Sequence, residues 1–436
     1  MKPSTPITNP SPSTQLRKAV FGGSLKLTCF GTRTGKFVLG LFLVSGSVPA
    51  WGQEIRAKQE GESTIRVVSE GRFETTFTKR SGFGTTWFDL KNDPGKRRDL
   101  GPRVGGEYGG GLLWVKFGVK ERDGSFEPTP IEDLKLLEAG PARIRVELRG
   151  VHNRYGLPGP GRALAALRFT MVYTLYPDGS VAIGYALEAS QDVPITGFLI
   201  ITRSTGAWGP SGKGEGKGEV HAAGEFGDEK PSGKTASSFT LQWSDGPTHF
   251  TDILMAAHRG RYNGGYWHEG YLDQDYRTAL TLRSGPGFLK EDALRKGTTH
   301  LSVLMRLAND MNSGKEAARY ANDYQSPDKL SVTSGESDAS DEGDRDQDGF
   351  NEEQGCYVLK AAPDAVEFTL HGSKVARMNP AFKVKGWKGS GTPRLTMAGT
   401  PLVQGTDFQA SSDGGVLLVK LARIVNSDVP VSITNK

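Results

Sequence analysis

Hydrophobic and polar positions alternate along much of the chain, which is the period-two pattern of half-buried β-strands. The clearest case is LRFTMVYTLYPDGSVAIGYALEA, residues 167–189. Apolar side chains recur at every second position on both sides of Pro177-Asp178-Gly179, a tripeptide typical of a tight turn. The pattern therefore predicts a hairpin with one face formed by Phe169, Met171, Tyr173, Leu175, Val181, Ile183 and Tyr185.

The same alternation, over shorter distances, predicts a long series of further strands. They are expected at residues 72–79, 112–119, 134–137, 142–148, 197–202, 238–243, 252–257, 277–282 and 300–306. One helix is predicted at residues 314–324, where Ala317, Ala318 and Ala321 favour helix and Pro327 ends it. Glycine accounts for 58 of the 436 residues, which favours a fold with many turns.

Beyond Gly355 only short strands are expected, at residues 356–360, 366–370, 382–386, 394–397 and 416–421. Many short strands within one small segment are typical of an immunoglobulin-like sandwich. We therefore expect a mainly β protein, with a large antiparallel domain at residues 51–333 and a small β-sandwich at 356–436. An acidic linker at 334–355 would join the two.

An apolar run near the N-terminus, FVLGLFLVSGSV at residues 37–48, has the length of a signal-peptide core. Arg33 and Lys36 precede it, and the small-residue site Val48-Pro49-Ala50 follows. We expect residues 1–50 to be a leader cleaved after Ala50, which predicts a secreted or periplasmic protein. An uncleaved anchor is the alternative, although a bilayer span needs about 20 apolar residues.

Removal of such a leader changes the charge and the cysteine count. Residues 1–50 hold six of the 54 basic residues and no acidic one, so 48 basic residues face 49 acidic residues in the remainder. The basic excess of +5 disappears, and nucleic acid is not an expected partner. Cys29 also lies in the leader, so Cys356 would remain alone, without an intramolecular disulfide.

The segment DRDQDGFNEE, residues 344–353, has the spacing of a calcium loop. Asp344, Asp346 and Asp348 occupy positions 1, 3 and 5, and Gly349 at position 6 permits a sharp turn. The carbonyl of Phe350 would be the ligand at position 7. Position 12 is Gly355 instead of the bidentate glutamate of an EF-hand, so Glu352 or Glu353 would have to replace it.

This departure makes the segment resemble the DxDxDG loops of dockerin and thrombospondin repeats more than a sensor EF-hand. A structural Ca²⁺ at the join between the two domains is the expected cofactor. A weak site suffices outside the cell, with a dissociation constant of about 10⁻⁴ to 10⁻³ M. The alternative is a solvated acidic linker without metal.

A second segment, AHRGRYNGGYWHEGYLDQDYR at residues 257–277, combines aromatic and ionisable side chains. Flat rings stack on sugars and charged groups hold hydroxyls and carboxylates, so this mixture suits a glycan site. Packing of the rings in a β-protein is the alternative. The candidate catalytic residues are His258, Arg261, Tyr262, His268 and Glu269, and the candidate substrate-binding residues are Arg259, Tyr266, Trp267 and Tyr271.

No GxSxG nucleophile motif, GxGxxG phosphate loop or histidine metal triad occurs in the sequence. A pair of carboxylates for glycoside hydrolysis stays open, because it is defined by a spatial separation.

The sequence pattern of segments such as VYTLYPDGSVAIGYAL and LEAGPARIRVELRG resembles that of the β-super-sandwich in galactose-mutarotase-like proteins and polysaccharide lyases. The segment FKVKGWKGSGTPRLTMAGTPLVQGTDFQA resembles the small sandwiches appended to such enzymes. This resemblance implies either a secreted lyase-like or epimerase-like enzyme on acidic polysaccharides, or a non-catalytic protein that binds cell-surface glycan. The sequence predicts no helical toroid of the kind that many lyases carry, which weakens the catalytic version. The sequence leaves the oligomeric state open.

Overall fold

The computed structural model describes two sets of residues. Backbone and side chains are described for residues 54–70, 72–79, 131–151, 167–192, 295–300, 302–306, 319–363 and 365–435. The backbone alone is described for residues 82–88, 97–99, 112–119, 122–130, 152–155, 163–166, 193–194, 197–204, 217–223, 238–244, 250–257, 266–272, 278–284, 293–294, 301, 307–308 and 314–318. All of them belong to one compact unit, Ser47–Lys436. The expected leader lies outside the described residues.

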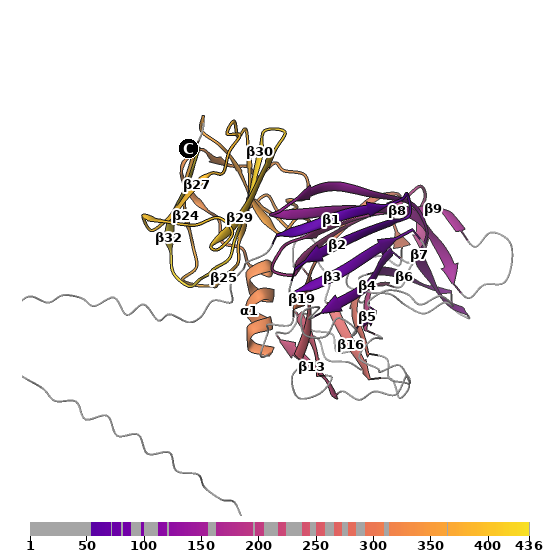
Figure 1. Ribbon diagram of the computed structural model, residues 1–436. Coiled ribbons are helices and arrows are strands. Elements are labelled where there is room, and N and C mark those ends of the chain that lie inside the picture. The colour runs from indigo at the N-terminus through magenta and orange to yellow at the C-terminus, as the bar shows by residue number, and fades with distance from the viewer. Residues whose placement is uncertain are drawn as a thin grey trace, which may run out of the picture. The chain divides into compact units, whose positions relative to one another are not determined.

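Two antiparallel sheets form the N-terminal part of this unit (Figure 1). The smaller sheet runs in the order β1 (Ile55–Glu60), β2 (Thr64–Ser69), β3 (Phe73–Thr78), β4 (Gly82–Phe88) and β5 (Arg97–Asp99). The larger has twelve strands in the order β13 (Lys217–Ala223), β14 (Ser238–Ser244), β15 (Phe250–Ala257), β19 (Gly297–Ala308), β10 (Ser180–Ala189), β9 (Ala163–Leu175), β8 (Arg143–Tyr155), β7 (Arg122–Gly140), β6 (Leu112–Val119), β12 (Gly197–Ser204), β17 (Thr278–Ser284) and β16 (Tyr266–Leu272). Strands β11 (Val193–Pro194) and β18 (Ala293–Leu294) form a separate two-stranded sheet.

Side chains from the two sheets bury each other. Strand β3 alternates buried and half-buried positions, so Phe73 and Phe77 point into the core. The rings of Phe77 and Tyr173 meet edge to face, with their centroids 5.1 Å apart. The predicted large antiparallel sandwich is therefore confirmed.

The predicted hairpin is formed by β9 and β10, with Ile183 opposite Tyr173. The turn closes through a hydrogen bond from the Tyr176 amide to the Ser180 carbonyl, 2.8 Å long. Gly179 adopts φ 82°, the left-handed conformation that glycine takes without steric cost. Strand β10 is buried along nearly all of its length, so both of its faces are covered.

The C-terminal part is a second, smaller sandwich. One sheet runs β20 (Ser331–Ser334), β24 (Ala365–Leu370), β32 (Val429–Thr434), β27 (Arg394–Met397) and β28 (Thr400–Pro401). The other runs β21 (Glu336–Ser337), β23 (Cys356–Lys360), β26 (Ala381–Lys385), β30 (Val416–Leu421) and β29 (Phe408–Asp413), with β22 (Phe350–Asn351) also paired to β23. Strands β25 (Arg377–Met378) and β31 (Ile424–Val425) form a separate pair.

One hydrophobic core joins the two C-terminal sheets. The ring centroids of Phe368 on one sheet and Phe382 on the other are 4.9 Å apart. Strands β23 and β26 run parallel, which departs from the antiparallel pattern of the remaining pairs. Cys356 on β23 is a buried free thiol.

The helix α1 spans Gly314–Gln325, one residue beyond the prediction. Among the described residues, no helix is long and apolar enough to cross a bilayer.

Candidate metal centre

The acidic segment lies on the loop between β21 and β22, and it is more buried than a solvated linker would be. Asp338, Asp341 and Asp344 are each less than 10% exposed. The loop is tied to β23 at both ends, because the Val358 amide donates to the Gly349 carbonyl and the Asp338 amide donates to the Val358 carbonyl, each at 2.9 Å. The segment is thus part of the folded C-terminal sandwich.

Asp344 shapes the turn of the loop through its carboxylate. One oxygen accepts hydrogen bonds from the amides of Gln347 and Asp348, at 2.7 and 3.3 Å, and the other accepts from Gly349 at 2.9 Å. Gln347 and Gly349 have φ of 62° and 92°, so the backbone bends sharply here. The oxygen that accepts from Gly349 has a second lone pair that a metal ion can use.

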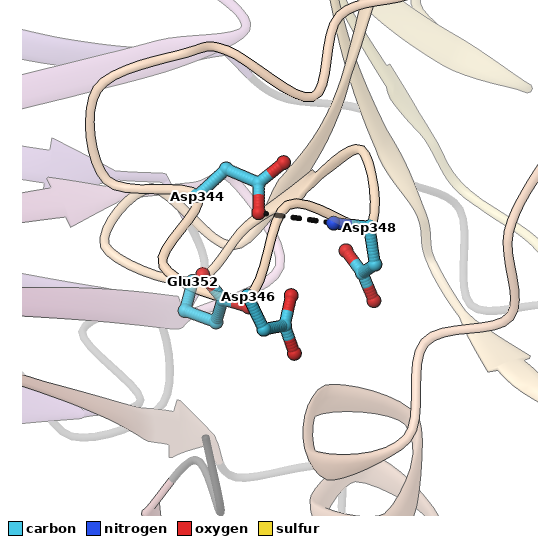
Figure 2. A group of neighbouring side chains, drawn as sticks. All are labelled: Asp344, Asp346, Asp348 and Glu352. Atoms are coloured by element: carbon cyan, nitrogen blue, oxygen red, sulfur yellow. Dashed lines mark hydrogen bonds between the residues drawn. The ribbon is translucent and has the colours of Figure 1, made fainter. Parts of the chain in front are cut away.

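Four carboxylates converge inside this turn, those of Asp344, Asp346, Asp348 and Glu352 (Figure 2). One oxygen from each lies within 4.8 Å of the others. Oxygens that share one Ca²⁺ at 2.3–2.6 Å can be at most about 5 Å apart, so this spacing fits a single ion. An all-oxygen donor set selects a hard cation such as Ca²⁺ or Mg²⁺.

The charge balance of this group favours a cation. Burial, reinforced by the negative charge of Asp346, raises the pKa of Asp348 to about 6 and the pKa of Glu352 to about 8. Burial also raises the pKa of Asp344. A bound divalent ion would remove this penalty, because it neutralises the carboxylates where they stand.

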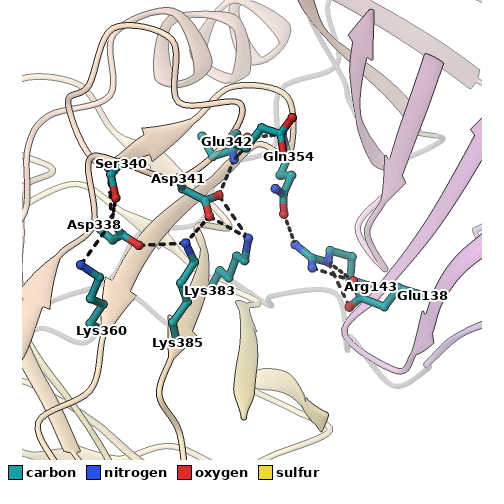
Figure 3. Close-up of polar contacts among 11 residues, drawn as sticks. Glu138, Arg143, Asp338, Ser340, Asp341, Glu342, Gln354, Lys360, Lys383 and Lys385 are labelled. Carbon is teal, nitrogen blue, oxygen red and sulfur yellow. Dashed lines mark hydrogen bonds and ion pairs between the residues drawn. The ribbon is translucent and has the colours of Figure 1, made fainter. Parts of the chain in front are cut away.

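The first half of the acidic segment has the opposite electrostatics, because lysines neutralise it (Figure 3). The Lys385 ammonium contacts Asp338 at 2.8 Å and also Asp341, and Lys383 contacts Asp341 at 3.0 Å. Burial alone would raise the pKa values of both aspartates, and these lysines reverse the effect and lower them. Lysine side chains therefore neutralise the aspartates in the first half of the segment. The four converging carboxylates in its second half form the candidate cation site.

Glu352 and Glu353, the two candidates for the last ligand, point to different partners. Glu352 is fully buried, belongs to the four-carboxylate group and accepts a 3.1 Å hydrogen bond from the Arg345 amide. Glu353 instead forms an ion pair with Arg345 and lies 3.3 Å from His300 on β19. The arrangement brings Glu352, and not Glu353, to the candidate metal site.

Phe350, expected to contribute its carbonyl, lies on β22 opposite Tyr357. The centroid of its buried ring lies 5.1 Å from the centroid of the Tyr357 ring and 6.3 Å from that of the Tyr324 ring. These contacts anchor the loop directly after Gly349. The role of the carbonyl as a ligand stays a prediction.

The aromatic and ionisable segment 257–277 is described only in part. His258, Arg259, Arg261 and Tyr262 lie outside the described residues. Tyr266, Trp267, His268, Glu269 and Tyr271 lie on β16, which ends the strand order of the twelve-stranded sheet and pairs with β17. Their predicted roles stay predictions.

No protein family model matches the chain, and no curated protein matches it in sequence. Among solved structures, the chain is similar to a GalM/aldose epimerase homologue from C. elegans, with 10% identity, a TM-score of 0.33, and coverage of 57% of this chain and 99% of that one. It is also similar to a mutant of the heparan sulfate lyase HepC from Pedobacter heparinus, with 8% identity and a TM-score of 0.28. That match covers 72% of this chain and 41% of the lyase, so this chain spans less than half of the lyase's length.

These neighbours include both kinds of protein that the sequence resembles, and the resemblance is confirmed to that extent. With TM-scores of 0.33 and 0.28, they carry no argument about what this chain binds or catalyses.

Proposed function

We propose that this chain is a secreted, calcium-stabilised protein that acts on acidic glycans. The calcium part rests on one observation, the convergence of four carboxylate oxygens within 4.8 Å in a loop whose backbone is already bent around Asp344. Calcium is favoured over magnesium because four carboxylates and a carbonyl can supply most of its six to eight ligands.

The surroundings of the loop support a structural role for the ion. Arg345, between two of the candidate ligands, reaches His300 on β19 at 2.6 Å. The carbonyl of Glu352 accepts a hydrogen bond from the Tyr324 hydroxyl on α1, 3.1 Å away. An ion held here would stabilise a segment that contacts the twelve-stranded sheet, the helix and the C-terminal sandwich.

Isothermal titration calorimetry with CaCl₂ on the full chain tests this proposal. We expect one site with a dissociation constant at or below about 10⁻³ M. Asp346→Ala should abolish the binding heat, because Asp346 is one of the four candidate ligands. Asp413→Ala, which removes an exposed carboxylate on β29, is the matched control. Equal heats for wild type and Asp346→Ala would contradict the proposal.

The glycan part rests on the residue types on and around β16 and on the resemblance to lyases and mutarotase-like proteins. In the enzymatic version, Arg259 or Arg261 neutralises a uronate carboxylate, and Tyr262 or Tyr266 exchanges protons during β-elimination. If the substrate is a free sugar, His258 or His268 with Glu269 opens and closes the ring. In the non-catalytic version, the same aromatic side chains bind glycan without turnover.

Incubation with a panel of acidic polysaccharides separates the two versions. A lyase produces unsaturated ends that absorb in the ultraviolet, and Tyr262→Phe should reduce that signal if Tyr262 exchanges the proton. Binding without product, unaffected by Tyr262→Phe, supports the non-catalytic version. The glycan proposal would be contradicted if the protein neither binds any of these polysaccharides nor releases product from them.

N-terminal sequencing of the exported protein tests the predicted leader, and Trp51 is the expected first residue.

A further inference from the structure

Three neighbouring strands of the C-terminal sandwich place a serine, a histidine and an aspartate at the same end of one sheet. Ser331 begins β20 and lies opposite Thr369 of β24, so His371, just past the end of β24, is its diagonal neighbour. Leu370 of β24 lies opposite Val429 of β32, and Asp428 immediately precedes that strand. The order β20-β24-β32 thus sets the three residues in a row.

Their polar atoms are within hydrogen-bond distance in that order. The Ser331 hydroxyl oxygen lies 2.8 Å from Nε2 of His371, and Nδ1 of His371 lies 2.9 Å from Oδ2 of Asp428. An ionised carboxylate can only accept a hydrogen bond, so in the neutral imidazole Nδ1 carries the proton and Nε2 can accept the serine hydroxyl proton. This is the arrangement of a nucleophile, a general base and an orienting acid.

Asp428 is held in place and kept ionised. Its second oxygen, Oδ1, accepts hydrogen bonds from the amides of Gly372 and Ser373, each at 3.2 Å. The hydrogen bond with His371, followed by those with the 372–373 loop, lowers the pKa of Asp428 below its usual range. The imidazole is therefore fixed through a carboxylate that the backbone orients.

The loop that carries His371 is also anchored. The Nε of Arg377, a fully buried side chain, donates to the His371 carbonyl at 2.8 Å, and the same guanidinium is paired with Asp323 at 2.8 Å and Asp328 at 3.1 Å. Gly372 packs so closely on the 425–427 loop that an added Cβ would lie 2.4 Å from the Val425 carbonyl oxygen. Only glycine at this position allows the two loops to bring His371 and Asp428 together.

We propose that Ser331, His371 and Asp428 form an acyl-transfer centre that hydrolyses short-chain carboxylic esters. This activity is separate from the calcium loop and from the 257–277 segment, and it goes beyond the proposed function.

The reaction balances with water as the only co-reactant. The Ser331 oxygen attacks the ester carbonyl carbon while Nε2 of His371 takes the hydroxyl proton. Collapse of the tetrahedral intermediate breaks the bond to the alcohol, which leaves with that proton. Water then attacks the acyl-serine in the same way, releasing the carboxylic acid and restoring Ser331.

Exposure of the centre indicates the substrate class. Ser331 is exposed, and the side chains of His371 and Asp428 are 29% and 45% exposed. Such an open site encloses little of the acyl group, so it suits a short one such as acetyl over a long chain. The same openness lets an ester that projects from a larger molecule reach the nucleophile.

Hydrolysis of p-nitrophenyl acetate by the full chain tests the proposal, together with covalent labelling by a fluorophosphonate and peptide mapping. We expect p-nitrophenol release above the rate in buffer and a label on Ser331. Ser331→Ala should lose both. His371→Gln should lower kcat at least about 100-fold, because the general base is removed.

Two further variants separate the proposed chemistry from general effects. Asp428→Asn should lower kcat and leave KM unchanged, because Asp428 is a positioning residue that does not touch the substrate. Ser412→Ala, at an exposed serine on β29, should keep both hydrolysis and labelling. Circular dichroism would verify that each variant is folded. The proposal would be overturned by absent hydrolysis in the wild type, by an unchanged rate in folded Ser331→Ala, or by a label elsewhere.

Discussion

Glu352 and Glu353 are adjacent in the chain and have opposite electrostatic surroundings. Burial and neighbouring aspartates raise the pKa of Glu352 to about 8, whereas Glu353 is paired with His300 and Arg345, and its pKa is lowered although burial opposes this. Sequence alone left both open as the last calcium ligand, because the choice depends on the direction in which each side chain leaves the β22–β23 turn.

Substitution of each glutamate by glutamine should therefore have opposite consequences. Glu352→Gln should weaken calcium binding by at least about tenfold. Above about pH 8, where Glu352 is ionised, it should also raise the melting temperature in EDTA, because a repelled buried carboxylate is replaced by a neutral amide. Glu353→Gln should lower the melting temperature with or without calcium, because Arg345 loses its partner. Calorimetry and thermal melts of the pair check this, and equal calcium affinities would contradict it.

The raised pKa values also predict how stability depends on pH. Because the folded-state values for Asp348 and Glu352 lie above those of an unfolded chain, the two groups stabilise the metal-free fold at low pH. That contribution is lost as the pH rises through about 6 and then about 8. Calcium binding requires the ionised forms and so strengthens over the same range.

We therefore expect the melting temperature gained on addition of calcium, relative to EDTA, to be larger at about pH 8.5 than at about pH 5.5. Differential scanning fluorimetry in matched buffers measures this difference. A calcium-dependent shift of equal size at both pH values would show that these carboxylates do not bind the ion.

At the scale of elements, Gly349 determines whether the metal loop can close. Its φ is 92°, and an added Cβ would lie 2.3 Å from the Ser337 hydroxyl oxygen on β21. Gly399, with φ 75° and open space around it, offers a matched control for the backbone conformation alone.

Gly399→Ala should cost about 1–2 kcal/mol, the penalty for a left-handed alanine. Gly349→Ala should destabilise the protein by more than that and weaken calcium binding, because the steric clash adds to the same penalty. Chemical denaturation and calorimetry on both variants check the comparison. Similar losses in the two variants would rule out close packing against β21 as the cause.

Several elements were predicted with their exact bounds, and others were missed for identifiable reasons. Strands β6, β23, β27 and β30 match their predicted ranges, and each begins directly after a glycine or a proline, residues that mark strand boundaries. Strand β7 runs from Arg122 to Gly140, whereas only residues 134–137 were predicted. Its register shifts at Pro128/Ile131, Ile131/Asp133 and Leu136/Glu138 interrupt the alternation that the prediction relied on.

Sites defined by spacing along the chain were easier to predict than sites assembled in space. The candidate metal site lies within one loop, and three of its four carboxylates followed from the DxDxDG pattern. Ser331, His371 and Asp428 are separated by 40 and 57 positions, and no motif contains them. What joins them is the neighbouring order of β20, β24 and β32, which periodicity does not reveal.

At the scale of the whole compact unit, a buried ionic cluster connects the β9–β10 hairpin to the C-terminal sandwich. Asp178 in the hairpin turn is fully buried and lies 3.2 Å from the Lys420 ammonium on β30. Burial would raise the pKa of Asp178, and the positive charges of Lys420 and Arg306 outweigh it and lower the pKa. The Lys420 ammonium also lies 4.4 Å from the centre of the Tyr176 ring.

Removal of Asp178 should be worse than removal of one of the two bases near it. Asp178→Asn removes the carboxylate that lies 3.2 Å from the buried Lys420 ammonium and whose pKa Arg306 also lowers, so we expect a loss of about 3–5 kcal/mol or more. Lys420→Met leaves Asp178 with Arg306 nearby and should cost less. Urea denaturation of both variants measures the order, and a reversed order would contradict the assignment of Asp178 as the shared counter-charge.

The buried thiol of Cys356 can be used to measure how often the C-terminal sandwich opens. It lies on β23, directly after the candidate metal loop, and is shielded from solvent. Burial also raises its pKa, so it should react with a maleimide only when the sandwich transiently opens. In a chain from which the expected leader and Cys29 have been removed, the alkylation rate would follow this one residue. Calcium should slow that rate and a chelator should accelerate it, which would make the lifetime of the closed state readable by mass spectrometry.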